Sequence, residues 1–526
     1  MSIISLSFFP FLLLVAATFF LIPGKLQWVV LCLANIIFYL CAGEVFLLYV
    51  LITSLAIFWA ALALEAVTKQ GKSLLSAADS AEEKKVIRKN TLHKKKLIST
   101  LALLISLGIW VVVKYGNFLL QNINVLFRTF KVGMQFHELN VLVPLGISYY
   151  TFHAVGYLID VYRGKYPPER NFARLFTFIS FFPHMIQGPF SRYDQLGKSL
   201  FDVHHFSYDR FCEGTSRILW GYFKKLLIAD KLGIAVATIF GSPTNYTGAY
   251  FLFAMVFYGL QIYADFSGYM DIMCGFCHIL GIQLAENFHQ PYFAKSVDEF
   301  WRRWHITLGK WFKDYVFYPV SMGKTAQKMG KWARKKYGAK AGKLLPGYFA
   351  LIFVWSITGL WHGANWTFWV WGYLNLFIII FSMQMEDVYA SIKAKLHIHN
   401  QVWWQFFCIV RTFLLVCCLR FFSIADNMSS ALATLRHAIH TFDLSVIRTP
   451  LSLFDGMTSN EIIVAMIGCI MVLFVDILNE TGHWEAVKKK CPFLIRNVIY
   501  AAMIFAIILF SGGDNDLVRG FIYANF

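Results

Sequence analysis

The stretch GYFALIFVWSITGLWHGANWTFWVWGYLNLFIIIFSMQ, residues 347–384, carries His362 and Gly363 inside a run that is otherwise almost wholly apolar. A membrane-spanning helix needs about 20 apolar residues, so this run is long enough for two such helices with a break at Gly363. Burying a polar ring in hydrocarbon is costly unless the ring is paired, so an intramembrane histidine indicates a functional site. A neutral imidazole is also a good general base near neutral pH.

The composition places that run in a membrane protein. Of the 526 residues, 58% are hydrophobic and only 15% are charged, which is far more apolar than a soluble domain. We predict an all-α, polytopic integral membrane protein, a single domain over 1–526 with about 11–12 transmembrane helices. The predicted spans are 3–22, 26–42, 45–67, 97–113, 139–160, 215–240, 249–271, two within 347–384, 402–422, 461–478 and 497–511.

The net charge of +18 is unevenly placed and indicates the topology. Lysine and arginine crowd a loop at 324–343, a linker at 69–96 and the triplet Lys488-Lys489-Lys490, which the positive-inside rule places in the cytoplasm. The loop 423–460 is then outside, and the C-terminal helix with its aromatic tail, 497–526, runs outward. These basic loops are short and no aromatic residues interleave them, so a nucleic-acid partner is excluded.

Two segments are expected to enter the membrane without crossing it. Residues 172–190 contain Pro183, Gly188 and Pro189, which suit a re-entrant segment. Counted from Gly347, about 15 residues of helix rise roughly 22 Å, less than the hydrocarbon core of roughly 30 Å. His362 is therefore predicted to stop inside the membrane, where it either caps the turn or acts chemically.

Residues 300–315 are predicted to form one amphipathic helix at the cytoplasmic interface. The apolar arc of this helix consists of Trp301, Trp304, Leu308, Trp311, Phe312 and Tyr315. The opposite, basic side consists of Arg302, Arg303, Lys310 and Lys313. His305 falls at the edge of the apolar arc and points inward, as a packed core residue or as part of a site. Arg302 and Arg303 are candidates to bind lipid headgroups or the phosphates of a nucleotide-bearing donor.

The run EFWRRWH at 299–305, followed by WHGA at 361–364, resembles the membrane-bound O-acyltransferase family, in the branch typified by the alginate O-acetylation membrane protein. Further matching motifs lie in family order within a motif core at 140–370. They are VPLGISYYTF at 143–152, QGPFSRY at 187–193, DFSGYMD at 265–271 and ENFHQPY at 286–292.

The resemblance implies transfer of an acyl group from a cytoplasmic thioester, with acetyl-CoA as donor substrate, to hydroxyls of an extracytoplasmic polysaccharide. It implies a central funnel, a bacterial inner-membrane location and an extracytoplasmic acyltransferase partner. His362 would be the essential catalytic residue and His305 the second histidine. Asn365, Tyr263 and Asp265 would line the path, or pack helices together instead.

The last six residues, FIYANF at 521–526, resemble an aromatic C-terminal motif of bacterial O-acylation systems, in which Tyr523 would relay the acyl group. Its alternative role is an aromatic anchor at the membrane interface. D-alanyl transfer from a carrier protein to teichoic acid, and a polysaccharide or lipid transporter, are the alternative functions. No bound cofactor is expected, and no residue spacing typical of a metal site is present.

Overall fold

The computed structural model describes residues 5, 7–398 and 401–511. By its internal contacts the chain forms two compact units, one made of Met1–Gly214 and Phe276–Ala285, the other of Thr215–Gly275 and Glu286–Phe526. Each unit is considered by itself below. The single domain expected over 1–526 stays a prediction.

The fold is all-helical, as the sequence predicts. Within the described residues there is no β-strand, and one isolated antiparallel bridge joins Phe288 to Trp304. The helices up to the start of the second unit are α1 (Phe8–Leu21), α2 (Gln27–Ala42), α3 (Glu44–Ala77), α4 (Ala81–Thr129), α5 (Ile147–Arg163), α6 (Phe172–Ile179), α7 (Lys198–Phe201) and α8 (Tyr208–Phe223).

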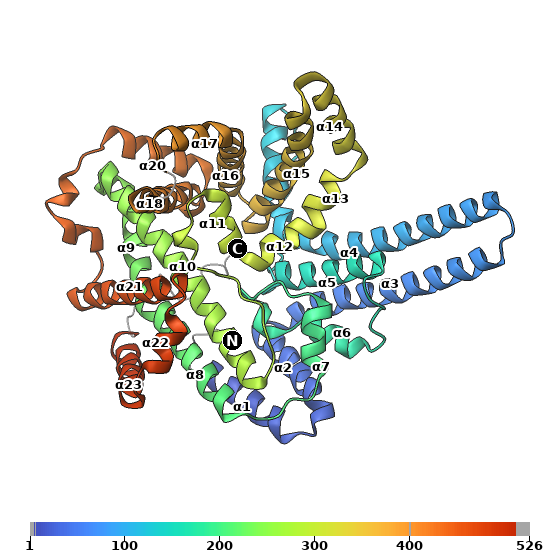
Figure 1. Cartoon of the computed structure of the whole chain (residues 1–526), viewed down its shortest axis with the longest axis horizontal. Coiled ribbons are helices and arrows are strands. Elements are labelled where there is room, and N and C mark those ends of the chain that lie inside the picture. Colours follow the sequence, from blue (N-terminus) through green and yellow to red (C-terminus); the bar gives the residue numbers. More distant parts are fainter. Residues whose placement is uncertain (1–4, 6, 399–400, 512–526) are drawn as a thin grey trace. The chain divides into compact units, whose positions relative to one another are not determined.

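The remaining helices belong mainly to the second unit, and Figure 1 shows them in chain order from green to red. They are the π-helical η4 (Lys224–Ala229), α9 (Asp230–Gly241), α10 (Gly248–Leu280), α11 (Val297–Arg303), α12 (Ile306–Phe312), the π-helical η7 (Lys313–Phe317), α13 (Tyr318–Ser321), α14 (Lys324–Tyr337), α15 (Ala339–His362), α16 (Trp366–Gln384), α17 (Glu386–Lys395), α18 (Val402–Leu419), α19 (Phe421–Ile424), α20 (Met428–His440), α21 (Ser459–Glu480), α22 (Trp484–Lys490) and α23 (Phe493–Phe510).

Among the described residues, nine helices are long and apolar enough to cross a membrane. This confirms a polytopic membrane protein, although the sequence-based count was 11–12. In the described part of the chain, the other three predicted spans, 3–22, 139–160 and 215–240, do not form helices that are both long and apolar enough to cross a membrane. The first helix, Phe8–Leu21, has 14 residues and Ile147–Arg163 has 17. The segment 215–240 runs through α8, η4 and α9 and carries buried lysines.

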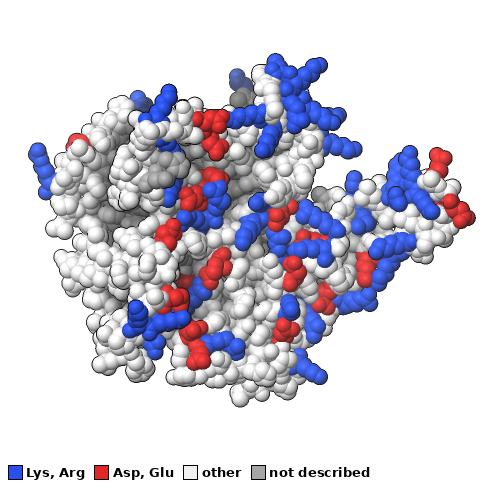
Figure 2. Space-filling model, in the orientation of Figure 1, with Lys and Arg blue, Asp and Glu red and all other residues white. Residues whose placement is uncertain are grey.

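The basic linker expected at 69–96 is helical instead of a loop. In the first unit α3 and α4 form a long hairpin whose end is basic (Figures 1 and 2). Ser80 begins α4, because its hydroxyl accepts a hydrogen bond from the Glu83 N–H at 3.1 Å. The two helices pack closely at Gly71, where an added Cβ would lie 2.6 Å from the Thr91 hydroxyl oxygen. Charge alone indicated an exposed segment, but not that the helices continue through it.

The basic loop expected at 324–343 is also helical. Residues Lys324–Tyr337 form α14, whose lysines and arginine are among the blue side chains gathered at the top of Figure 2. Its opposite face is small and buried, with Ala326, Gly330 and Ala333. An added Cβ at Gly330 would lie 2.8 Å from the Pro346 ring, so α14 packs tightly on the start of α15.

The hairpin of α15 and α16 carries His362 at its turn. The helix α15 has 24 residues, starts at Ala339 and passes through Pro346, so it is about 36 Å long. The helix thus begins before Gly347, the residue from which the depth of His362 was counted, and the predicted place of His362 inside the membrane stays a prediction. The break at Gly363 is confirmed, since α15 ends there and α16 begins at Trp366.

Small residues let the two helices approach each other. A Cβ at Gly359 would lie 2.8 Å from the backbone oxygen of Phe368, whereas a Cβ at Gly347, on the same helix, would meet only Phe317 at 4.0 Å. We expect Gly359→Val to push the hairpin apart and destabilise the protein by about 1–3 kcal/mol. Gly347→Val is the matched control. Thermal unfolding in detergent should show a lower midpoint for Gly359→Val alone, and equal midpoints would contradict this packing.

Candidate active site

The segment that holds His305 is not one helix, so the continuous amphipathic helix predicted over 300–315 is wrong. The helix α11 ends at Arg303, Trp304 is extended, and His305 adopts the left-handed conformation with φ of +48° before α12 begins at Ile306. A non-glycine residue there is strained by about 1–3 kcal/mol. The inward direction predicted for His305 is confirmed, because it is 3% exposed.

Hydrogen bonds from another part of the chain explain the break. The His289 N–H donates to the Arg303 carbonyl at 3.0 Å, and the Ile306 N–H donates to the Asn287 carbonyl at 3.0 Å. Together with the bridge between Phe288 and Trp304, these bonds replace those of a continuous helix. Periodicity within 300–315 could not reveal a partner segment that lies earlier in the sequence.

Asn287 organises this turn, a role that the sequence reasoning missed. Its buried side-chain oxygen accepts from the Thr307 N–H at 3.1 Å and the Thr307 hydroxyl at 2.6 Å. The same oxygen lies 3.4 Å from Nδ1 of His305. The one signal for Asn287 in the sequence was its position in the motif at 286–292, to which no role was assigned.

His305 and His362 both lie next to the indole ring of Trp361. The His305 ring centre is 5.8 Å from that of Trp361, and the His362 ring centre is 4.9 Å from it. His305 also meets Phe266 edge-on at 4.8 Å. Burial lowers the pKa of His305 to about 3, so its imidazole is neutral at physiological pH. The structure thus brings the two predicted histidines into one region of the second unit.

His362 lies at the end of α15 within a group of aromatic rings. Trp371 approaches it edge-on at 4.8 Å and Phe368 lies roughly parallel at 6.3 Å. Gly363 is required directly after it, because a Cβ there would overlap the Phe368 ring. These aromatic contacts hold the imidazole in place.

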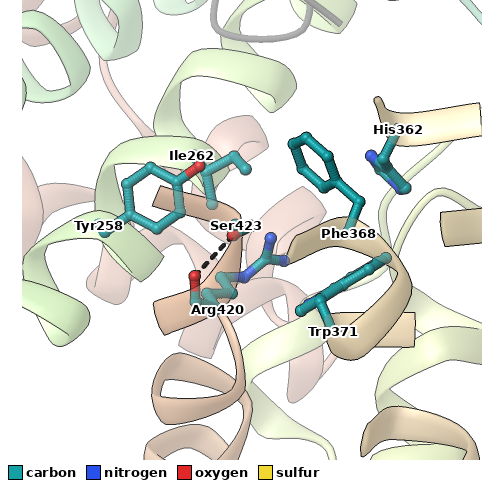
Figure 3. Close-up of a pocket in the computed structure, with 7 residues that line it drawn as sticks. All are labelled: Tyr258, Ile262, His362, Phe368, Trp371, Arg420 and Ser423. Atoms are coloured by element: carbon teal, nitrogen blue, oxygen red, sulfur yellow. Dashed lines mark hydrogen bonds between the residues drawn. The ribbon is translucent and has the colours of Figure 1, made fainter. Parts of the chain in front are cut away.

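A small hollow opens beside His362 (Figure 3). It has room for about one water molecule. The residues that line it are Tyr258, Ile262, His362, Phe368, Trp371, Arg420 and Ser423. Arg420 was also missed from the sequence, although an arginine inside the apolar span 402–424 was a signal.

Asn365 begins the next helix. Its side-chain oxygen accepts a hydrogen bond from the Thr367 N–H at 3.1 Å, and its amide donates to the Asp426 carbonyl. It is the N-cap of α16 and does not line the hollow. Its predicted place on the substrate path stays a prediction.

Tyr263 and Asp265 both have partners on neighbouring helices. The Tyr263 hydroxyl donates to Asp476 at 2.9 Å, which joins α10 to α21. The Lys225 ammonium lies 2.7 Å from Asp265, and both side chains are fully buried. These contacts fit the helix-packing alternative that the sequence left open for both residues.

The two arginines of the run at 299–305 differ in exposure. Arg303 pairs with Glu299 at 2.8 Å and with Glu480 at 2.7 Å, which ties α11 to α21. These carboxylates, Glu480 foremost, raise the pKa of the Arg303 guanidinium. Arg302 is 64% exposed and pairs with Asp298 on the same helix. Of the two, Arg302 is the one accessible to a donor phosphate or a lipid headgroup.

Tyr523 lies outside the described residues. Within residues 5, 7–398 and 401–511, no group of three His, Cys, Asp or Glu side chains is arranged to hold a metal ion.

Comparison with known proteins tests the family resemblance. Residues 168–334 match the model of the membrane-bound O-acyltransferase family. Over that segment the chain is similar to the membrane-bound O-acyltransferases. The match includes His305 and ends before His362.

Named relatives extend the match. The chain is 38% identical over 273 residues to the probable alginate O-acetylase AlgI of Azotobacter vinelandii, covering 52% of this chain and 51% of the relative. It is 29% identical over 329 residues to the peptidoglycan O-acetyltransferase of Helicobacter pylori, covering 58% of each. It is 29% identical over 228 residues to the teichoic acid D-alanyltransferase of Bacillus subtilis, covering 43% of this chain and 55% of the relative. The chain thus spans about half the length of the curated relatives it matches.

The side chain of Asn287 should contribute more to the stability of the turn than the Thr307 hydroxyl does. We expect Asn287→Ala to cost about 1–3 kcal/mol for each buried donor left without an acceptor. Thr307→Val removes only one hydroxyl and should cost less. Thermal unfolding in detergent gives the order, and equal midpoints for wild type and Asn287→Ala would contradict this role.

Proposed function

We propose that this protein is a membrane O-acyltransferase that moves acetyl from cytoplasmic acetyl-CoA to hydroxyls of an extracytoplasmic polysaccharide. The observation that carries the proposal is the pair of histidines next to the Trp361 ring, with His362 beside a hollow. The family match and the names of the two O-acetylating relatives support the same chemistry.

His362 is the general base in this mechanism. The acceptor hydroxyl attacks the thioester carbonyl, and the imidazole of His362 takes the hydroxyl proton as the new C–O bond forms. When the C–S bond breaks, the imidazolium returns that proton to the thiolate. An imidazole is a suitable general base for this exchange near neutral pH.

His305 has a different role, because its deep burial keeps it neutral. A neutral imidazole donates or accepts one hydrogen bond, which suits positioning of the thioester. Arg302, exposed on α11, is placed to meet the phosphates of CoA. Both roles rest on the donor entering from the side of the basic residues.

Acetyl is favoured over D-alanyl as the transferred group. Relatives named for O-acetylation include AlgI at 38% identity, whereas the D-alanyltransferase of Bacillus subtilis is 29% identical over a shorter segment. Transfer of D-alanine from a carrier protein to teichoic acid is the second candidate. We place the protein in the bacterial inner membrane, working with an extracytoplasmic acyltransferase partner.

His362→Gln should abolish acetylation, because glutamine is polar and of similar size but takes up no proton at neutral pH. The matched control is His289→Gln, since His289 is exposed and its ring lies outside the hollow. The measurement is ester-linked acetate on the secreted polysaccharide of cells that carry each variant in place of the native gene. Protein abundance in membranes should be the same for both. His305→Gln should leave residual turnover with a raised KM for acetyl-CoA.

Purified protein offered radiolabelled acetyl-CoA, with de-O-acetylated polysaccharide from the same cells, tests the donor directly. Release of CoA that depends on His362 supports the proposal. Normal acetylation by His362→Gln would make His362 structural. No turnover of acetyl-CoA, together with transfer from a D-alanyl carrier protein, would favour the second candidate.

Tyr523→Phe tests the proposed acyl relay. The change keeps the aromatic ring and removes the hydroxyl nucleophile, so polysaccharide acetylation should stop while membrane abundance and acetyl-CoA binding persist. Full acetylation by this variant would leave Tyr523 as an aromatic anchor.

A further inference from the structure

Arg420 is a buried cation inside an apolar span. It lies between α18 and α19, within the span Val402–Ile424, and is 3% exposed. Arg420 is the C-cap of α18, and even at the end of an apolar span a buried charge is costly when it has no polar partner. Such a residue is rare unless it is paired or functional.

The guanidinium of Arg420 has no hydrogen-bond partner among the residues that the structure describes. Its Nε and Nη2 atoms are buried without an acceptor. Its nearest compensation is the ring of Trp304, with Cζ 4.7 Å from the ring centre. The Ser423 hydroxyl bonds to the backbone carbonyl of Arg420 and leaves the side chain unpaired.

Three other buried cations of the second unit are paired with carboxylates. Lys225 lies 2.7 Å from Asp265, Lys224 lies 2.6 Å from Asp271, and Lys231 lies 2.8 Å from Glu461. The fold therefore neutralises these three cations with carboxylates. Arg420 departs from that pattern, which indicates that its partner is a ligand.

The unpaired guanidinium faces the hollow that His362 also lines. Figure 3 shows its side chain reaching toward Phe368 and Trp371, with His362 beyond them. His305 is not among the lining residues, and its neutral ring carries no charge to offer. The space takes about one water molecule, which suits a single oxygen atom better than a sugar ring.

We infer that Arg420 is a catalytic residue that binds the carbonyl oxygen of the acyl thioester and stabilises the negative charge that forms on it. This inference rests on the proposed function. A cation held in place beside the reacting carbonyl stabilises such charge strongly, because it need not reorganise during the reaction.

The acceptor hydroxyl oxygen bonds to the carbonyl carbon, its proton goes to His362, and the carbonyl π electrons move onto the oxygen that faces Arg420. The electrons then return, the C–S bond breaks, and the thiolate takes the proton from His362. The products are the acetyl ester and CoA, and no further reactant is required.

The test compares Arg420→Met, which keeps an unbranched side chain and removes the guanidinium with its charge, with Arg420→Lys. The control is Arg411→Met on the same helix, since Arg411 is exposed and binds the Lys295 carbonyl at 2.8 Å. With the purified protein, acetyl-CoA and de-O-acetylated polysaccharide, we expect kcat to fall about 10²–10³-fold in Arg420→Met. The KM for acetyl-CoA should change less than the rate, Arg420→Lys should be intermediate, and Arg411→Met should match wild type.

Thermal unfolding separates this role from a structural one. Removal of an unpaired buried charge should raise the unfolding midpoint of Arg420→Met, whereas loss of a structural contact would lower it. A wild-type rate in Arg420→Met, or a lowered midpoint with a matching loss of folded protein, overturns the inference. If Arg420→Met raises only the KM for acceptors that carry a carboxylate, Arg420 binds the acceptor instead, and the inference is also overturned. If wild type itself transfers no acetyl, the proposed function fails and the inference fails with it.

Discussion

The ion pair between Lys225 and Asp265 holds the centre of the second unit together. Both side chains are almost completely buried and lie 2.7 Å apart, and Lys225 also lies 2.8 Å from Asp230, so the buried ammonium is balanced by two carboxylates. Lys225 comes from the π-helical turn η4 and Asp265 from α10. Close contact of Gly221 with the backbone of Gly268 brings the two segments near enough for the pair to form. The same helix α10 supplies Phe266, which packs against His305.

The turn around His305 depends on this frame. Phe266 and Met270 of α10 contact His305 and Asn287 respectively, and Asn287 in turn binds Thr307. The left-handed conformation of His305 is thereby held by bonds to another segment. Trp361 links this turn to the end of α15, where His362 lies. The site is thus built from three stretches of chain that are far apart in sequence.

Much of this arrangement was predictable from the sequence, for local reasons. The long apolar run with a glycine after His362 predicted the hairpin of α15 and α16 correctly, because length and composition decide such elements. The motifs pointed to His305 and His362, which the structure brings together. The break at Trp304 and His305 was not predictable, since the bonds that cause it come from 287–289. The basic segments at 69–96 and 324–343 were predicted as loops from their charge. They are helical because they pack closely on neighbouring helices at Gly71 and Gly330, and charge alone does not reveal such packing.

The role of each charged residue follows from its partners better than from its motif. Asp265 belongs to a recognisable motif, yet its charge is neutralised by Lys225 and its contacts explain packing. Arg303 likewise lies in the run at 299–305 and is paired with Glu480. Arg420 belongs to none of the quoted motifs, but its guanidinium lacks a partner within the described part of the chain and faces the hollow beside His362. In an apolar interior a paired charge stabilises the fold, whereas an unpaired one destabilises it and is retained for what it binds.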